Sequence, residues 1–352
     1  MVPRERVLAA LRRQVPDRVP MYMEFTPPVV DKFHSITGSS DPADYFDLDI
    51  REVSFEPCKK VADFSMYLGE LPPGSNVNEW GVGEVKGSGW SHFVDFVHPL
   101  QKAATAKEIE DYPFPDMTQE YRWQHIPKAV KRWHELGYAV RGLPPFYGGT
   151  VFETAWALRG LENLLVDFVQ NRAMAGALLD RVTDISKGTA TILAAAGVDV
   201  LVTGDDVGMQ RTMMMSPSMW REWLKPRLAS VIEAAKEANP EVLIFYHSCG
   251  YIEPIIPDLI EIGVDILNPV QPESMDPERI KKLYGNELAF WGTIGTQTTL
   301  PFGTPDEVRQ EVKRMIETVG DGGGLLISPT HVIEPDVPWE NIMAFVDAVK
   351  EY

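Results

Sequence analysis

Apolar and polar positions alternate in a regular way along the second half of the chain. Short apolar runs rich in Val, Ile, Leu and Phe predict buried strands over 138–142, 198–204, 242–249, 264–271, 288–293 and 323–328. Between the strands, apolar residues recur at helical spacing and predict helices over 121–137, 152–169, 172–196, 217–238, 252–262, 277–284, 305–319 and 339–350. This alternation indicates a parallel sheet covered by helices.

The first hundred residues show a weaker pattern. They predict a helix over 4–14 and a first strand over 19–25, but residues 26–102 hold many Pro, Gly and aromatic residues without a clean period. We expect loops, short helices and a hairpin over 80–90 in this region. Long loops in an otherwise regular α/β chain often cover a functional site, so part of 26–102 is expected to lie over one.

About eight strands are predicted, which is enough to close an α/β barrel. The expected fold is therefore a (β/α)8 TIM barrel with an elaborated N-terminal region. A length of 352 residues is compatible with two domains, but barrels of this size are common as one, and we expect a single domain over 1–352. A doubly wound open sheet is the alternative. No Gly-x-Gly-x-x-Gly follows an early strand, so a dinucleotide-binding fold has no support.

The strand predicted over 242–249 ends in an unusual group of polar residues. His247 and Cys249 are two positions apart, so their side chains point to the same face of a strand. An imidazole and a thiol side by side are ligands that zinc prefers. Gly250 then allows a sharp turn beyond them. The alternative is a buried structural cysteine beside a core histidine, which is common for an isolated His-x-Cys.

Polar side chains also follow most of the other predicted strands. The C-terminal ends of parallel strands in a barrel form one mouth, where active sites lie, so these residues are expected to converge around His247 and Cys249. They are Glu24, Tyr147, Asp205, Asp206, Asn268, Gln271, Gln297 and His331. Two local alternatives remain open: Asp205 or Asp206 could cap a turn, and Glu153 could serve only the positive end of its helix.

Composition narrows the function and the cellular setting. The formal net charge is −18, which argues against nucleic acid as a partner because phosphates need a basic surface. The two cysteines, Cys58 and Cys249, do not form a disulfide framework. No stretch resembles a signal peptide or approaches a membrane span, so a cytoplasmic protein without a membrane partner is expected.

Several short motifs together resemble one known superfamily. They are Asp17-Arg-Val-Pro20, His98-Pro-Leu100, Tyr112-Pro-Phe-Pro-Asp116, Gly204-Asp-Asp-Val-Gly208, Tyr246-His-Ser-Cys-Gly250, Asp265-Ile-Leu-Asn-Pro269, Ser328-Pro-Thr-His331 and Pro338-Trp-Glu-Asn341. The chain resembles the uroporphyrinogen decarboxylase superfamily and, within it, the zinc-dependent methyltransferases that work with corrinoid proteins. This resemblance covers nearly the whole chain and implies one TIM barrel.

The two branches of that superfamily differ at the site. Decarboxylases carry arginines just after the first strand, whereas residues 21–26 here contain none and contribute Glu24 instead. The methyltransferases have the His-x-Cys pair and a third, thiolate ligand near the C-terminus. His331 stands at that position in this chain, which is a departure from the methyltransferase pattern.

The resemblance therefore implies an enzyme that moves a methyl group between a small methylated substrate, such as a methoxy-aromatic one, and the cobalt of a corrinoid on a partner protein. The expected zinc ligands are His247, Cys249 and His331, with Glu24, Glu153 or Asp205 in reserve. His331, Asp205 and Glu153 are the expected catalytic groups. Substrate contacts are expected from Glu24, Tyr147, Asp206, Asn268, Gln271 and Gln297. Porphyrinogen decarboxylation and a non-catalytic metal- or corrinoid-binding protein are the alternatives.

Overall fold

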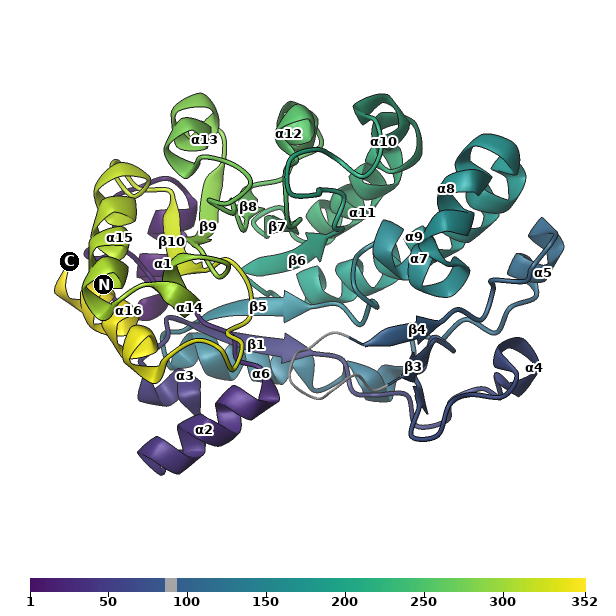
Figure 1. Ribbon diagram of the computed structural model, residues 1–352, viewed down its shortest axis with the longest axis horizontal. Helices are drawn as coiled ribbons and strands as arrows, with labels where there is room; N and C mark the ends of the chain where they lie inside the picture. The colour runs from purple at the N-terminus through teal and green to yellow at the C-terminus, as the bar shows by residue number, and fades with distance from the viewer. Residues whose placement is uncertain (86–93) are drawn as a thin grey trace.

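A curved parallel sheet forms the centre of the molecule. The computed structural model describes residues 1–85 and 94–352 (Figure 1). Seven strands pair in the order β1-β5-β6-β7-β8-β9-β10, and every pairing is parallel. Their bounds are β1 Ile50–Ser54, β5 Ala139–Leu143, β6 Val200–Gly204, β7 Leu243–His247, β8 Ile266–Asn268, β9 Ala289–Ile294 and β10 Leu325–Pro329. The TIM-barrel prediction is confirmed at the level of this architecture.

The eighth position of the barrel is held by the segment around Met21. The predicted strand over 19–25 makes only two isolated parallel bridges, Met21 with Ile327 and Phe25 with Ile333. The amide of Tyr22 donates to the carbonyl of Ile327 at 3.1 Å, so the segment lies along β10. Among the barrel strands, β1 is the one that the sequence pattern did not predict, and it lies within residues 26–102. Arg51 and Glu52 interrupt its apolar run and hide the strand pattern.

Helices surround the sheet and close one end of it. In chain order they are α1 Pro3–Leu11, α2 Pro27–Thr37, α3 Pro42–Tyr45, α4 Ser65–Leu68, α5 Ala106–Glu110, α6 Ile126–Glu135, α7 Phe152–Arg159, α8 Leu161–Gln170, α9 Arg172–Ala195, α10 Pro217–Trp223, α11 Lys225–Ala238, α12 Ile256–Glu261, α13 Pro277–Tyr284, α14 Thr299–Phe302, α15 Pro305–Thr318 and α16 Trp339–Glu351. Single turns of 3-10 helix lie at Glu120–Arg122 and Glu253–Ile255.

Two of the predicted helices are each divided into two α-helices in the structure. The helix expected over 152–169 breaks at Gly160, whose φ of 88° lies in the left-handed region and ends α7 before α8 begins. The helix expected over 217–238 divides into α10 and α11 at Leu224, just before Pro226. Proline has no N–H to donate and is well placed in the first turn of a new helix.

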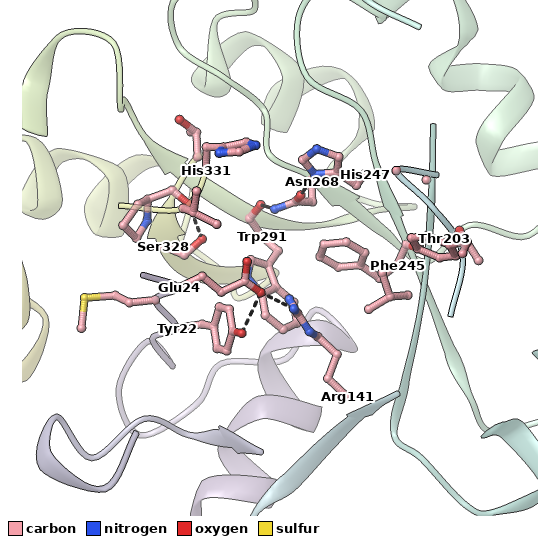
Figure 2. A pocket seen from close by; sticks show the side chains of 18 residues that line it. Tyr22, Glu24, Arg141, Thr203, Phe245, His247, Asn268, Trp291, Ser328 and His331 are labelled. Atoms are coloured by element: carbon pink, nitrogen blue, oxygen red, sulfur yellow. Dashed lines mark hydrogen bonds and ion pairs between the residues drawn. The ribbon is translucent and has the colours of Figure 1, made fainter. Parts of the chain in front are cut away.

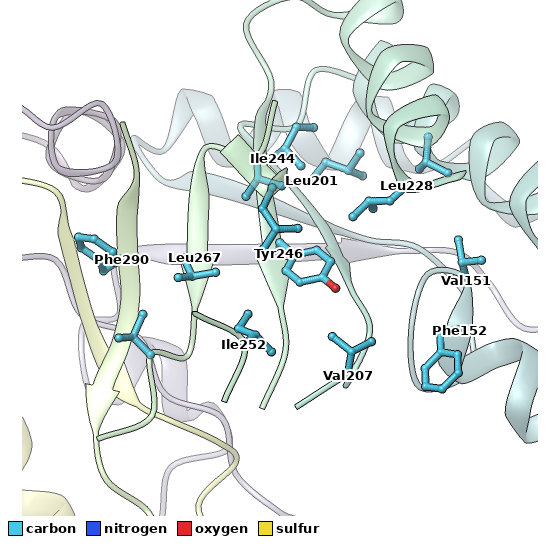
Figure 3. Close-up of a cluster of buried hydrophobic side chains, with 14 of the residues drawn as sticks. Val151, Phe152, Leu201, Val207, Leu228, Ile244, Tyr246, Ile252, Leu267 and Phe290 are labelled. Carbon is cyan, nitrogen blue, oxygen red and sulfur yellow. The ribbon is translucent and has the colours of Figure 1, made fainter. Parts of the chain in front are cut away.

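Two apolar cores lie on the two faces of the sheet. Inside the barrel, alternate residues of the strands meet, such as Ile50, Ala139, Phe245 and Trp291, and Leu11 of α1 packs among them. Helix α1 therefore plugs the N-terminal end of the barrel. The intervening strand residues point outward and pack against the helices, as Tyr246 and its neighbours show in Figure 3. This alternation points the side chains of Arg141, His247 and Asn268 toward the barrel mouth.

A small antiparallel sheet lies beyond the C-terminal ends of the barrel strands (Figure 1). It consists of β2 Asn76–Val77, β3 Gly83–Val85 and β4 Asp95–Val97. The hairpin expected over 80–90 extends into 86–93, which lie outside the described residues. In the described part of the chain, no helix is long and apolar enough to cross a membrane.

Candidate metal centre and its two cavities

Three side chains from two distant parts of the chain meet at the barrel mouth. His247 ends β7, Cys249 follows two residues later, and His331 comes just after β10. One ligand atom from each side chain lies within 4.8 Å of the others. The Cys249 Sγ lies 3.5 Å from Nε2 of His247, close to the separation of about 3.6 Å that tetrahedral zinc imposes on a nitrogen and a sulfur ligand. The donor set and its spacing fit zinc.

Neighbouring groups fix the orientation of the His–Cys pair. Nδ1 of His247 lies 2.5 Å from Oδ1 of Asn268, whose Nδ2 donates to the Trp291 carbonyl at 2.7 Å. Because Asn268 presents its oxygen, His247 carries its proton on Nδ1 and leaves the Nε2 lone pair free for a metal. The amide of Cys249 donates to Asp206 Oδ1 at 2.7 Å and so fixes the backbone beneath the thiol.

The loop that carries Cys249 is also held by tight backbone packing. Gly250 has a φ of 79°, and its amide donates to Oε1 of Gln271 at 3.0 Å. A Cβ built on Gly208 would lie only 2.4 Å from the Cys249 carbonyl oxygen. The loops after β6 and β7 therefore approach as closely as their glycines permit, which leaves the thiol little freedom to move.

Three carboxylates gather beside the metal-ligand cluster, which consists of His247, Cys249 and His331. Asp205 accepts hydrogen bonds from the amides of Val151 and Glu153 at the start of α7, while Glu153 Oε2 accepts from the amide of Asp206 at 2.9 Å. Burial and the nearby charge of Asp206 raise the pKa of Glu153 to about 7. Part of Glu153 therefore stays protonated at neutral pH, as a general acid requires.

An inner cavity of about 220 Å³ extends from the two histidines into the barrel. Figure 2 shows His247 and His331 at one end, Tyr22, Glu24 and Arg141 at the other, and Trp291 between them. Arg141 is ion-paired with Glu24 and, at 2.7 Å, with Glu52. Sequence analysis missed Arg141. Its signal was a charged residue at an inward position of an apolar strand, two residues after Ala139.

A wider outer cavity of about 1030 Å³ opens on the other side of the cluster. It shares His247 and His331 with the inner cavity, and Cys249 also lines it. Phe96 of β4 packs against Tyr147 and Trp156 with ring centroids 5.5 Å apart, which forms an aromatic wall. The expectation that part of 26–102 covers the mouth is confirmed by the residues around Phe96.

The predicted site residues separate into two groups in the structure. Those lining at least one cavity are Glu24, Tyr147, Glu153, Asp206, His247, Cys249, Asn268, Gln271, Gln297 and His331. Among them, Asn268 and Gln271 use their side chains on His247 and on the Gly250 amide, which makes them positioning residues. Asp205 lines neither cavity and is 2% exposed. Its carboxylate accepts hydrogen bonds from the amides of Val151 and Glu153, 54 and 52 residues earlier in the chain, and not from the turn that follows it.

The residues that sequence analysis did not single out lie mainly on the cavity walls. They include Tyr22, Phe96, His98, Arg141, Trp156, Phe245 and Trp291. His98 is held by its Nδ1, which lies 2.7 Å from the Ala157 carbonyl oxygen. Aromatic residues on strands are usually core residues, so their type alone does not distinguish a cavity wall from a packed interior.

The fold and the site define an α/β barrel with a His–Cys–His ligand cluster at its mouth. The uroporphyrinogen decarboxylase (URO-D) family matches residues 97–352, and the chain belongs to this family. It is 30% identical over 174 residues to a methylcobamide:CoM methyltransferase of Methanosarcina barkeri, a match that covers 49% of this chain and 48% of the relative. The chain thus spans about half the length of that relative.

Decarboxylases are also among the relatives. A uroporphyrinogen decarboxylase of Actinobacillus succinogenes is 24% identical over 264 residues, which cover 73% of this chain and 71% of that protein. A solved methyltransferase from Methanosarcina mazei superimposes with a TM-score of 0.70 at 20% identity, covering 100% of this chain and 99% of that one. At this identity the structural match supports the fold alone.

Proposed function

We propose that the protein is a zinc-dependent methyltransferase that moves a methyl group between a small methylated substrate and the cobalt of a corrinoid carried by a separate protein. The observation that carries this proposal is the convergence of one ligand atom each from His247, Cys249 and His331 within 4.8 Å. The match to a methylcobamide:CoM methyltransferase supports the same reaction class.

The residues present fit a catalytic zinc rather than a structural one. Two imidazoles and one thiolate are three protein ligands, and catalytic zinc sites keep their fourth position for water or substrate. When bound, zinc would act as a Lewis acid that stabilises the oxygen or sulfur released from, or accepting, the methyl group. Asn268 and Asp206 hold His247 and the Cys249 backbone in position for this role.

Glu153 is the proposed proton donor for the departing oxygen. It lines the outer cavity together with Cys249, and its pKa of about 7 keeps part of it protonated at neutral pH. A proton given to an alkoxide or phenoxide would prevent the reverse reaction. Asp205 assists indirectly, because its carboxylate fixes the amide of Glu153 at 2.9 Å. We therefore favour the demethylating direction.

The outer cavity argues against porphyrinogen decarboxylation. Among its described lining residues there is no Lys or Arg, whereas Asp95, Asp206, Glu334 and Asp336 all contribute carboxylates. A porphyrinogen with many carboxylates would meet like charges across this surface. A neutral methyl ether would not be repelled in this way.

The direct test is methyl transfer to free cob(I)alamin, which can stand in for the corrinoid protein. Zinc-loaded protein should demethylate a small aryl methyl ether and form methylcob(III)alamin, followed by its absorption spectrum. Chelated protein should be inactive, and zinc should restore it. Glu153→Gln should lower the rate by about 10²-fold or more if this residue supplies the proton. Equal rates with and without zinc would overturn the proposal.

A further inference from the structure

The floor of the inner cavity holds a charged group whose hydrogen-bonding capacity is only partly used. Arg141 is 7% exposed, and it pairs with Glu24 and Glu52 through its Nη2 atom. Its Nε is buried and has no hydrogen-bond partner. Because this Nε is enclosed by protein atoms, only the outer nitrogens of the guanidinium are left for a ligand in the cavity.

Glu24 offers the complementary acceptor beside it. Its Oε1 accepts hydrogen bonds from Tyr22 and Arg141, while 38% of the side chain is accessible because it faces the cavity. Glu52 pairs with the same guanidinium but is not among the cavity's lining residues. The floor thus presents a donor and an acceptor together, and only one of its two glutamates faces the cavity.

The charges of the floor add up to a negative balance. Two carboxylates, Glu24 and Glu52, surround one guanidinium, so the cluster carries a formal charge of −1. In a cavity with apolar walls, an incoming anion would be repelled, whereas a neutral hydroxyl or an amine would find a partner. The walls are aromatic, with Phe146, Phe245 and Trp291 around the cavity.

We propose that the inner cavity binds the far end of the methylated substrate and that this end carries a hydrogen-bond donor and no negative charge. The substrate class is a small aryl methyl ether with a hydroxyl or amino group on the ring. The inference rests on the proposed function, which puts the ether oxygen at the metal-ligand cluster. The ring then lies against Trp291, its polar group meets Glu24 and Arg141, and the methyl group faces the outer cavity.

The two-cavity arrangement supports this orientation. Displacement at a methyl carbon requires the attacking atom to approach opposite the leaving oxygen. His247 and His331 line both cavities, so a leaving group inside the barrel and an acceptor in the outer cavity lie on opposite sides of the cluster. An inner volume of about 220 Å³ holds a substituted benzene ring but is too small for a corrin.

Calorimetric titration of the zinc-loaded protein tests the inference without requiring turnover. The probes are 3- and 4-methoxyphenol, anisole, and 3- and 4-methoxybenzoate. At least one methoxyphenol should bind about tenfold or more tightly than anisole, as a hydrogen bond to a charged group predicts, and the benzoates should bind more weakly than anisole. Benzoates that bind as tightly as the phenols, or phenols that do not bind, would overturn the inference.

Two variants distinguish direct contact between Glu24 and the substrate from the general effect of removing one negative charge beside Arg141. Glu24→Gln and Glu52→Gln each remove one carboxylate from Arg141, but only Glu24 lines the cavity. Glu24→Gln should abolish the preference of the protein for methoxyphenol over anisole, whereas Glu52→Gln should retain it. Equal loss in both variants would contradict direct recognition. Selective binding without methyl transfer to cob(I)alamin would instead refute the proposed function and leave the subsite standing.

Discussion

The raised pKa of Glu153 lowers the stability of the folded protein at alkaline pH. Burial first, and then the charge of Asp206, raise its pKa from 4.5 to about 7. A carboxyl group that binds its proton more tightly in the folded state stabilises the fold fully below pH 4.5. That stability is lost as the pH rises through 7, where the buried group must ionise.

This residue gives a prediction about stability in the metal-free protein. Glu153→Gln should remove that loss and raise the free energy of unfolding at pH 8 by about 1–3 kcal/mol, since one pKa unit corresponds to about 1.36 kcal/mol. Urea unfolding between pH 5 and pH 8 measures the effect. Glu233→Gln, on an exposed position of α11, is the control. Equal pH profiles for wild type and Glu153→Gln would show that the fold does not raise the pKa of Glu153.

At the residue scale, the sequence predicts the proposed metal ligands better than it predicts the residues that hold them in position. His247 and Cys249 are recognisable because strand geometry places them on one face. The approach of His331 to them, and the Arg141–Glu24 pair, depend on barrel closure and join residues more than 80 and 110 positions apart. No local pattern contains that information. Asp205 and Asp206 are adjacent in sequence, yet one caps a helix and the other holds Cys249.

At the scale of elements, the contact between the loops after β6 and β7 positions Cys249 of the proposed metal centre. A Cβ on Gly208 would meet the Cys249 carbonyl oxygen at 2.4 Å and the Gly250 carbonyl carbon at 2.8 Å. Both are backbone atoms that cannot rotate away. Gly208→Ala should therefore displace the Cys249 loop and lower zinc affinity by about 10–100-fold, the range for lost support of a ligand.

A matched glycine provides the control. Gly176 lies within α9, and a Cβ there would meet nothing within 4 Å. Gly176→Ala should keep full zinc affinity and raise the free energy of unfolding by up to about 1 kcal/mol, because alanine is the better helix former. Competition with a chromogenic zinc chelator measures both variants. The same affinity in Gly208→Ala as in wild type would show that the loop contact does not hold the thiol.

The strands and helices after residue 120 were predictable because the hydrophobic period changes cleanly there. Strand β8 is shorter than its predicted range of 264–271, since Pro269 has no amide to continue the ladder. The sequence pattern predicted a strand at 19–25 and none at 50–54, whereas the regular strand of the structure is β1 at Ile50–Ser54. The segment at 19–25 is apolar but makes only isolated bridges. Strand β1 carries Arg51 and Glu52, whose charges pair with Asp44 and Arg141.

At the scale of the whole molecule, one apolar core joins the barrel to the N-terminal elaboration. Phe64, Trp80 and Tyr112 belong to the same buried cluster as Leu201 and Tyr246 of the barrel strands. We therefore propose one domain over 1–352 and predict a single unfolding transition. Far-UV circular dichroism and tryptophan fluorescence should give coincident melting curves. Two resolved transitions would show that the region before residue 120 folds separately.

The metal centre is the central claim, and zinc stoichiometry tests it most directly. Cys249→Ala removes one proposed ligand, and Cys58→Ala removes the other cysteine, which lies outside the metal-ligand cluster. Plasma emission analysis of the dialysed proteins should find one zinc per chain in wild type and Cys58→Ala, and essentially none in Cys249→Ala or His331→Ala. Circular dichroism should show that all four remain folded. One tightly bound zinc per chain in Cys249→Ala would contradict the account.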